Sequence, residues 1–262
     1  MRQPETIASA ANPLIKDVRH AIAQGGLTSQ GWSVAETPHL LDEALRSRCA
    51  VRQVLVAESA REQLPRLNGI RVAILPDALL QKVSGTEASQ GVIALVEPPG
   101  WKLEQLFEGR PLVVVLDSLQ DPGNAGAIVR AAEAFGATGA IFLKGTASPF
   151  NPKTLRASAG SLFRVPFLYG VDPALARAAF EERRVTLYAA IPSRAPVRSV
   201  ADADLTAACA LIVGNEGRGV SPEWRGVAQG VSIPTVAVES LNAAMAAGIL
   251  LYEARRQRSA RA

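Results

Sequence analysis

The chain has 262 residues, a length that fits one large domain or two small ones. Hydrophobic residues make up 48% and charged residues 20%, as in folded globular proteins, which excludes a mainly disordered state. The net charge of +4 permits an acidic partner such as RNA without requiring one. Two distant cysteines and two histidines exclude a disulfide framework and argue against a metal site and a Ser-His-Asp triad.

Targeting and membrane signals are weak. No apolar run approaches the ~20 residues that a membrane helix needs. The N-terminal segment lacks the apolar core of a signal peptide. We therefore expect a cytoplasmic protein without a membrane partner.

The first part of the chain alternates helix and strand patterns, which predicts a small α/β domain at 1–98. Helices are expected at Pro13–Gln24, with a proline in the first turn, and at 38–48. Strand patterns lie at 32–36, 51–57, 71–75 and 92–96. A segment rich in Pro and Gly, at 99–110, is expected to link this domain to a second one at 111–262.

The second domain opens with LVVVL at 112–116, a continuous apolar run typical of a strand buried on both faces of a parallel sheet. A turn and a helix through Gly136 follow, and the final helix is expected to begin after Ser240 as its N-cap. Further strands are expected at 140–143, 165–168, 185–190, 211–213 and 231–233, and further helices near 152–162, 172–184 and 241–258. This repeated order predicts an α/β fold with a mainly parallel sheet.

The first segment with chemical potential is DPGNAGAIVR, at 121–130. Glycines after a buried strand allow a sharp turn, and a helix N-terminus offers free N–H groups to an anion. Arg130, just inside the helix, is placed to hold a phosphate. A purely structural interpretation pairs Arg130 with Glu133 one turn later. The segment matches neither GxGxxG nor GxxxxGK[ST], so neither a nicotinamide cofactor nor a nucleoside triphosphate is indicated.

Two further segments follow later strands. The loop GNEGRGVSPE, at 214–223, comes after the strand at 211–213, and ligands of parallel sheets bind beyond the C-terminal strand ends. Its structural interpretation is a loop with one surface pair between Glu216 and Arg218. The segment IPTVAVESLNAAMAAGILLY, at 233–252, holds a helix rich in small residues, which by itself is typical of a capped core helix.

Together, in this order, the three segments resemble the three motifs of the SpoU (TrmH) family in the SPOUT superfamily of RNA methyltransferases. NPKTLRASAGSLFRVP, at 151–166, is similar to the family's intermediate motif, and residues 7–97 resemble its N-terminal RNA-binding domain, which is similar to ribosomal proteins. The resemblance implies a C-terminal α/β domain threaded into a deep trefoil knot, S-adenosylmethionine as cofactor, no metal, and a homodimer with an active site shared between subunits.

The resemblance also assigns roles to residues of this chain. Cofactor contacts are implied at Gly214, Ile233 and Leu241. The implied catalytic set is Arg130, Asn124, Glu216, Ser240 and Asn242, and Arg156 is expected to hold RNA phosphate. In the charge-neutral first domain a local patch would have to contact RNA, and the candidates are Lys16, Arg19, Arg46, Arg48 and Arg52.

The implied reaction is methyl transfer to a ribose 2′-hydroxyl of structured RNA, with large-subunit ribosomal RNA as the first expectation. Family proposals make Arg130 a general base, but arginine stays protonated far above neutral pH, which favours a role in orienting phosphate and stabilising alkoxide. The alternatives are a non-catalytic RNA-binding or ribosome-assembly protein on the same fold, a tRNA 2′-O-methyltransferase, or a base methyltransferase, which the PGNAG motif with Arg130 argues against.

Two departures from the family pattern bear on the site. The loop at 233–240 is about one residue shorter than usual, with VAV at 236–238 where a glycine is common, and Ala244 stands where many relatives carry serine. The main site residues are all present, so we expect an active enzyme. Some antibiotic-resistance methyltransferases share this layout, and the sequence leaves the target RNA and nucleotide open.

Overall fold

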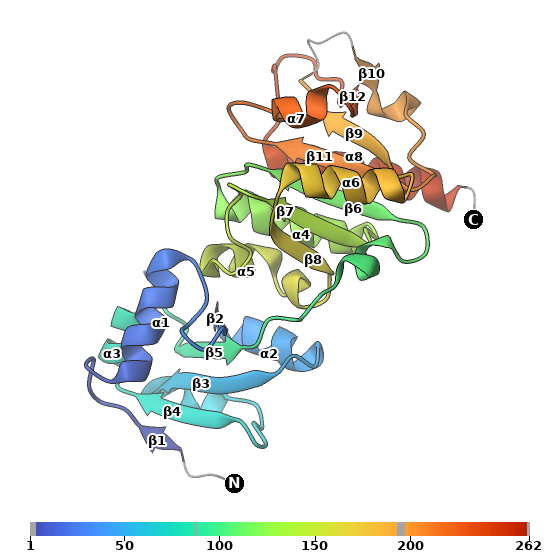
Figure 1. Cartoon of the computed structure of the whole chain (residues 1–262). Coiled ribbons are helices and arrows are strands. Elements are labelled where there is room, and N and C mark those ends of the chain that lie inside the picture. The colour runs from blue at the N-terminus through green and yellow to red at the C-terminus, as the bar shows by residue number, and fades with distance from the viewer. Residues whose placement is uncertain (1–3, 87, 193–196, 261–262) are drawn as a thin grey trace. The chain divides into compact units, whose positions relative to one another are not determined.

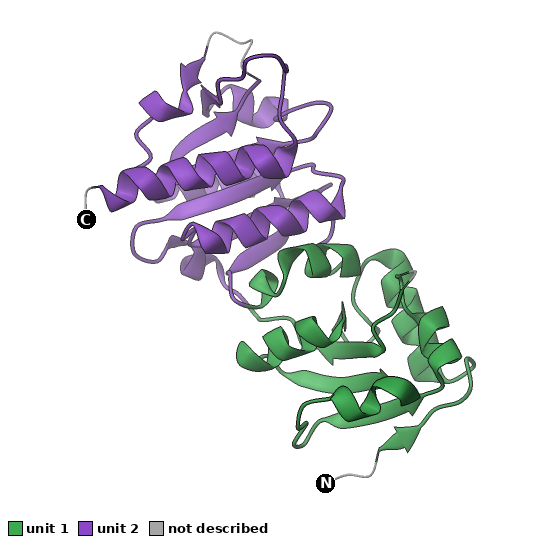
Figure 2. Ribbon diagram, turned by 180° about the vertical axis from the view of Figure 1, so that it is seen from behind, with its two compact units in different colours: residues 1–100, 150–163 green, residues 101–149, 164–262 purple. Residues whose placement is uncertain are grey.

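The computed structural model describes residues 4–86, 88–192 and 197–260, which form two compact units (Figures 1 and 2). Unit 1 combines residues 1–100 with 150–163, and unit 2 combines 101–149 with 164–262. Most of the segment expected to be a linker belongs to unit 2. There Leu103–Phe107 forms a 3-10 helix, because its Leu106 is fully buried in the core of that unit.

Unit 1 is built on a mixed five-stranded sheet in the order β1-β4-β3-β5-β2. Its strands are β1 (Glu5–Thr6), β2 (Ser33–Glu36), β3 (Val51–Ala57), β4 (Arg71–Leu75) and β5 (Val92–Val96). The pairs β1–β4 and β3–β4 are parallel, whereas β5 runs antiparallel to both β3 and β2. The four strands expected from the sequence are confirmed, and the short edge strand β1 is an addition.

The helices of unit 1 are α1 (Pro13–Gln24), α2 (Pro38–Arg46), α3 (Asp77–Val83) and α5 (Pro152–Ser158), with 3-10 turns at Glu58–Gln63 and Ser161–Phe163. Asn12 caps α1 through its side chain, and Gly25 ends it with a φ of 60°, a conformation that favours glycine. Helix α2 ends two residues earlier than expected, because Arg48 adopts a left-handed backbone with a φ of 56°.

Unit 2 contains a seven-stranded sheet in the order β10-β12-β9-β11-β6-β7-β8. Its strands are β6 (Leu112–Asp117), β7 (Gly139–Leu143), β8 (Phe167–Val171), β9 (Thr186–Ala190), β10 (Arg198–Ser199), β11 (Cys209–Gly214) and β12 (Gln229–Ser232). Every pairing among these described strands is parallel. The expected α/β fold with a mainly parallel sheet is confirmed.

Helices cover both faces of this sheet. They are α4 (Pro122–Ala134), α6 (Pro173–Glu182), the short α7 (Pro222–Arg225) and α8 (Ala243–Ser259), and a 3-10 turn lies at Val200–Asp202. The opposite views of Figures 1 and 2 show α6 on one face and α4 with α8 on the other. On the α6 face, Phe180 and Trp224 meet edge to face and pack against alternate residues of the central strands, among them Val113 and Ile212.

Helix α5 lies in unit 1, although its sequence was expected to belong to the second domain. It ends at Ser158 rather than near 162, because Ala159 turns left-handed before the 3-10 turn. Its buried face, with Thr154 and Leu155 fully or almost fully covered, packs against β2. Burial of this face, which combines Pro152 and Leu155 with Thr154 and Ser158, joins the segment to unit 1.

Arg156 projects from α5 to an ion pair with Glu36 on β2. Glu36 is 3% exposed, and it also accepts hydrogen bonds from Ser84 Oγ at 2.8 Å and from the backbone N–H of Gly85 at 2.7 Å. A buried carboxylate needs such partners. The structure therefore gives Arg156, expected to bind RNA phosphate, a partner within unit 1.

We expect Arg156→Ala to lower the free energy of unfolding by about 3 kcal/mol, because Glu36 would stay buried without its cation. Urea unfolding of the full chain measures this. The control is Arg52→Ala, which breaks a half-exposed pair with Glu97 and should cost at most about 1 kcal/mol. Unchanged stability together with weakened RNA binding would contradict this prediction and would support the predicted contact of Arg156 with RNA phosphate.

Candidate active site

Three motif-bearing loops leave the sheet of unit 2 at one edge. Strands β6 and β11 are neighbours in parallel register up to the pair Asp117 and Gly214, so the loops that follow them start side by side. Strand β12 pairs with β9, with Val231 opposite Ala190. Because all of these strands are parallel, their C-terminal ends and the loops after them gather at the same edge, where ligands of such sheets bind.

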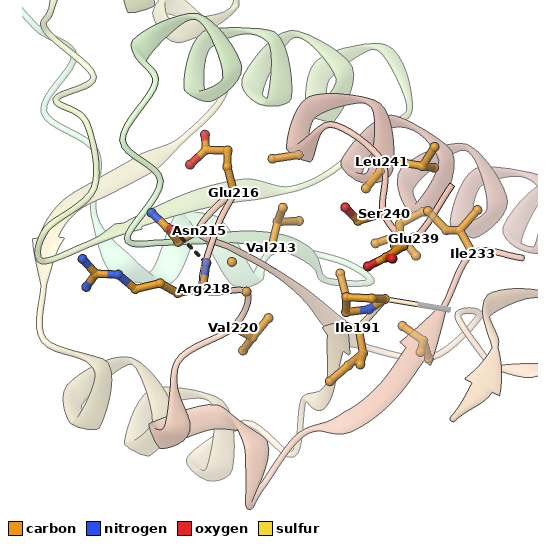
Figure 3. A pocket seen from close by; sticks show the side chains of 18 of the residues that line it. Ile191, Val213, Asn215, Glu216, Arg218, Val220, Ile233, Glu239, Ser240 and Leu241 are labelled. Atoms are coloured by element: carbon orange, nitrogen blue, oxygen red, sulfur yellow. Dashed lines mark hydrogen bonds between the residues drawn. The ribbon is translucent and has the colours of Figure 1, made fainter. Parts of the chain in front are cut away.

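A cavity of about 480 Å³ opens at this edge (Figure 3). Figure 3 shows Asn215 and Arg218 on one side of it and Ile233, Glu239, Ser240 and Leu241 on the other. Five of the residues expected to form the site line the cavity: Gly214, Glu216, Ile233, Ser240 and Leu241. The rest of its lining includes Ile191, Val213, Gly217, Val220, Arg225, Val231 and Leu250. The volume is in the range of small-molecule sites.

The loop after β11 is folded tightly on itself by Asn215. The Asn215 side-chain oxygen accepts hydrogen bonds from the N–H groups of Gly217 and Arg218, both at 3.0 Å, and its amide donates to the Ser118 carbonyl at 2.9 Å. The backbones of Asn215 and Gly219 also bond to each other. The sequence reasoning gave loop organisation to Glu216 and missed Asn215, although asparagine beside glycine after a strand is a recognisable turn signal.

A second residue that the sequence reasoning missed is Asp117, at the end of β6. It is 2% exposed, and its carboxylate accepts a hydrogen bond of 2.7 Å from the backbone N–H of Ser221. This bond ties the far end of the loop to the strand that precedes α4. Apart from its place directly before the turn, no sequence signal marked Asp117 as part of the site.

Asn124, Glu216 and Asn242 form a hydrogen-bonded relay that joins the three motifs. The Asn242 amide donates to Asn124 Oδ1 at 3.0 Å, and the Asn124 amide donates to Glu216 Oε1 at 2.8 Å. Each amide therefore donates toward the carboxylate, and the orientation of the Asn124 amide depends on Glu216 being an acceptor. The structure brings these three predicted residues together from α4, the loop after β11 and the start of α8.

The relay also sets the charge state of Glu216. Partial burial acts to raise the pKa of the Glu216 carboxyl, but the hydrogen bond from Asn124 and several backbone N–H groups favour the ionised form and together lower that pKa below its ordinary value. The carboxylate is therefore ionised at neutral pH, when the relay is complete.

Ser240 does not cap the final helix, as the sequence pattern had indicated. Helix α8 begins at Ala243, and Asn242 is its N-cap, because the Asn242 Oδ1 accepts from the N–H groups of Ala244 and Met245. Asn242 thus caps the helix with its oxygen and serves the relay with its nitrogen. Ser240 is exposed and lines the cavity instead.

Arg130 lies on α4, exposed and outside the cavity lining. The expected pairs are absent: Glu133 binds Arg164, with one contact at 3.0 Å, and the Asn124 amide donates to Glu216 rather than orienting Arg130. Among the described residues nothing forms an ion pair or hydrogen bond with Arg130. Its guanidinium is free to meet an anion from outside the chain.

We expect Gly214→Ala to abolish cofactor binding and to destabilise unit 2. A Cβ at this position would lie 2.2 Å from the carbonyl carbon of Gly219 and from the Val220 nitrogen, so the loop would have to open. Calorimetric titration with S-adenosylmethionine and thermal unfolding test this. The matched control is Gly217→Ala, whose Cβ would meet its nearest atom at 3.7 Å, an ordinary contact. Equal effects of the two changes would contradict the argument.

The described residues contain no group of three or more His, Cys, Asp or Glu side chains that could hold a metal ion. Among the helices that the structure describes, none has the length and apolarity to cross a membrane.

Comparison with known proteins identifies the family. The model of the SpoU rRNA Methylase family matches residues 111–252, and the model for RNA 2′-O ribose methyltransferase substrate binding matches residues 38–101. The first match covers the cavity, the relay and Arg130. The chain belongs to the SpoU rRNA methylase family.

Relatives and solved structures are similar over nearly the whole chain. The 23S rRNA (guanosine(2553)-2′-O)-methyltransferase RlmP of Bacillus subtilis is 32% identical, over 95% of this chain and 98% of its own. The 23S rRNA (uridine(2479)-2′-O)-methyltransferase of Streptomyces viridochromogenes is 37% identical, over 76% and 71%. The crystal structure of AviRb from Streptomyces viridochromogenes with AdoMet superposes with a TM-score of 0.81 at 30% identity, covering 95% of this chain and 100% of that one.

Proposed function

We propose that this chain methylates a ribose 2′-hydroxyl of ribosomal RNA, and that the substrate is the RNA of the large subunit. The chain is an RNA 2′-O-ribose methyltransferase that uses S-adenosylmethionine, as family membership and AdoMet-bound structural neighbours establish. The observation that supports the finer statement is the cavity at the strand ends, joined by the relay to the helix that carries Arg130. The relatives named as 23S rRNA methyltransferases support the large subunit as target.

The residues of the cavity fit S-adenosylmethionine. Apolar side chains such as Val213, Val220 and Leu250 suit the adenine and methylene parts, while the tightly folded glycine loop presents backbone groups. The lining carries charges of both signs, the carboxylates of Glu216 and Glu239 and the guanidinium groups of Arg218 and Arg225. This suits a ligand that has a sulfonium, an ammonium and a carboxylate group. We assign the backbone contacts to Gly214, Ile233 and Leu241. When bound, the cofactor supplies an electrophilic methyl group.

The residues of this chain position the reactants and stabilise the charge that develops during the reaction. A ribose hydroxyl is a weak nucleophile until its proton leaves, so a cation near the oxygen stabilises the alkoxide that develops. Arg130, which has no ion-pair or hydrogen-bond partner among the described residues, is a cation available for this, and it also suits bidentate contact with the adjacent phosphate. Asn124, Glu216 and Asn242 hold the loop, α4 and α8 in register, and the Ser240 hydroxyl offers a hydrogen bond at the cavity wall.

A homodimer with a shared site is part of the proposal. Arg130 lies outside the cavity lining of its own chain, which suits a site completed by a second protomer. Helix α8 carries small residues and exposes Met245 and Tyr252, which are 59% and 56% accessible, and the loop before it exposes Val236 and Val238. Such a surface favours close packing with a second copy.

The remaining features of the proposal are domain roles, chain path and location. We assign RNA binding to the domain at 1–98 and methyl transfer to 111–262, and we propose that the chain after β11 is threaded into the trefoil knot of the superfamily. Because the proposed substrate is ribosomal RNA, we also propose a cytoplasmic location.

The test is a map of ribose methylation in the ribosomal and transfer RNAs of a deletion strain and its parent, read as protection from alkaline cleavage. We expect one 23S rRNA site to be lost on deletion and restored by the wild-type gene but not by Arg130→Ala. A site lost from transfer RNA would identify the alternative substrate. An unchanged map, with cofactor binding retained in calorimetry, would favour a protein that binds RNA without methylating it.

A further inference from the structure

Three cations of unit 1 surround one hollow. Lys16 and Arg19 project from α1 and Lys82 from α3, and these helices lie side by side in Figure 1. All three are exposed, and none forms an ion pair within the described part of the chain. By contrast, Arg46 pairs with Glu43 and Arg52 pairs with Glu97. Ion pairing therefore distinguishes Lys16 and Arg19 from Arg46 and Arg52, and Arg48, the remaining candidate, does not line the hollow.

The hollow has a volume of about 450 Å³. Its lining includes the apolar side chains of Val83, which is 2% exposed, and Ile22, together with the polar residues His20 and Ser84. The chain after α3 runs directly against α1, because a Cβ on Gly85 would lie 2.8 Å from Ile22 Cγ2. This close approach sets Lys82 opposite the cations of α1.

No described carboxylate lines the hollow. Asp17, next to Lys16 in sequence, accepts two hydrogen bonds of 2.8 Å from Ser29, and Glu36 forms an ion pair with Arg156. Neither carboxylate forms an ion pair with a cation of the hollow. Three cations without an ion-pair partner among the described residues therefore line one hollow, although residues 1–98 carry equal numbers of basic and acidic side chains.

We infer that the hollow between α1 and α3 is a binding site for the phosphate backbone of the RNA substrate, with Lys16, Arg19 and Lys82 as the contacts. The inference rests on the proposed function and adds to it. Helix α1 precedes residues 38–101, the range matched by the substrate-binding family model, so the site extends recognition beyond that range. Phosphate contacts position an RNA without reading its sequence, which suits lysine and arginine side chains.

The experiment compares full-length wild type with the triple variant Lys16→Ala/Arg19→Ala/Lys82→Ala. Binding to deproteinised ribosomal RNA is measured by filter retention over a series of KCl concentrations. Each phosphate contact contributes about 0.7 to 0.9 to the slope of log affinity against log salt. Three lost contacts should flatten the slope by about 2 and weaken binding at 0.1 M salt about 100-fold. The KM for RNA should rise in methylation assays, since these contacts act before the chemical step.

The control variant Arg61→Ala/Arg66→Ala/Arg71→Ala removes the same charge from exposed positions of unit 1 that do not line the hollow. It should change the slope and KM little. Equal weakening by both variants would overturn the inference, because only overall charge would then matter, and so would a triple variant that binds like wild type. Restored binding in Lys16→Arg/Arg19→Lys/Lys82→Arg would show that the cations themselves act.

The same experiment separates failure of this inference from failure of the proposed function. Calorimetry with S-adenosylmethionine verifies that unit 2 of each variant is intact. If wild type methylates ribosomal RNA and the triple variant has the same RNA affinity and KM, only the inference about the hollow is refuted. Wild type that binds the cofactor yet methylates no ribosomal RNA refutes the proposed function.

Discussion

Replacing Arg130 with alanine should reduce the single-turnover rate of RNA methylation by about 100-fold or more, the usual cost of removing a preorganised electrostatic contact to developing charge. Affinity for S-adenosylmethionine should stay unchanged, because Arg130 does not line the cavity. Folding should also be unaffected, within about 0.5 kcal/mol, because the side chain is exposed and unpaired among the described residues. Single-turnover transfer of a labelled methyl group measures the rate.

The variant Arg130→Lys decides between the two roles of this residue. An arginine general base would be hindered by its very high pKa, so a lysine, with an ordinary pKa near 10.4, would be the better base and should not slow the reaction. If Arg130 instead acts as a stabilising cation that binds phosphate through its planar guanidinium, lysine cannot form the same bidentate contact, and the rate should fall below that of wild type. The control Arg177→Ala, which breaks an exposed pair with Glu181 on α6, should leave the rate unchanged. Full activity of Arg130→Ala would refute both roles.

Replacing Asn124 with aspartate should have the second large effect. The new carboxylate keeps the shape of the side chain but cannot donate to Glu216 Oε1, so two acceptors would face each other where a 2.8 Å hydrogen bond now lies. We expect the methylation rate at neutral pH to fall about 100-fold, as loops that position the reactants move apart. The rate assay used for Arg130 measures it.

The pKa of Glu216 determines how the methylation rate of Asn124→Asp should change with pH. In wild type the pKa of Glu216 is lowered on folding, so the stability from its hydrogen bonds is present above the unfolded pKa and is lost as pH falls through the folded one. In Asn124→Asp the adjacent negative charge raises the pKa of Glu216 instead, and a shared proton can restore one hydrogen bond. Activity should therefore recover in part toward acid pH.

Asn124→Ala is the control for that recovery. Alanine removes both hydrogen bonds of the relay and adds no charge, so it should lower the rate without any recovery toward acid pH. A recovery of the same size in both variants would contradict the electrostatic explanation. A normal rate in Asn124→Asp would show that the relay does not position the site.

Local patterns in the sequence determined most of the elements. Helix α1 and strands β3, β4 and β5 lie where alternation and turn residues predicted them, because their signals act over a few neighbouring positions. The run at 112–116 is wholly buried, as a central parallel strand requires. The order of strand and helix signals was also sufficient for the α/β class, and the three motifs were sufficient for the family.

Tertiary structure decided how these pieces serve the site. Both Ser240 and Asn242 can cap a helix, and only the position of Asn124, 118 residues away in sequence, favoured Asn242. Nothing local in the sequence reveals that Arg156 pairs with Glu36, 120 residues away, and nothing local reveals that α5 belongs to unit 1. Cap signals and hydrophobic periods depend on neighbours in sequence. A buried ion pair or a hydrogen-bonded relay depends instead on which strands become neighbours in space, and that is determined by the packing of the whole core.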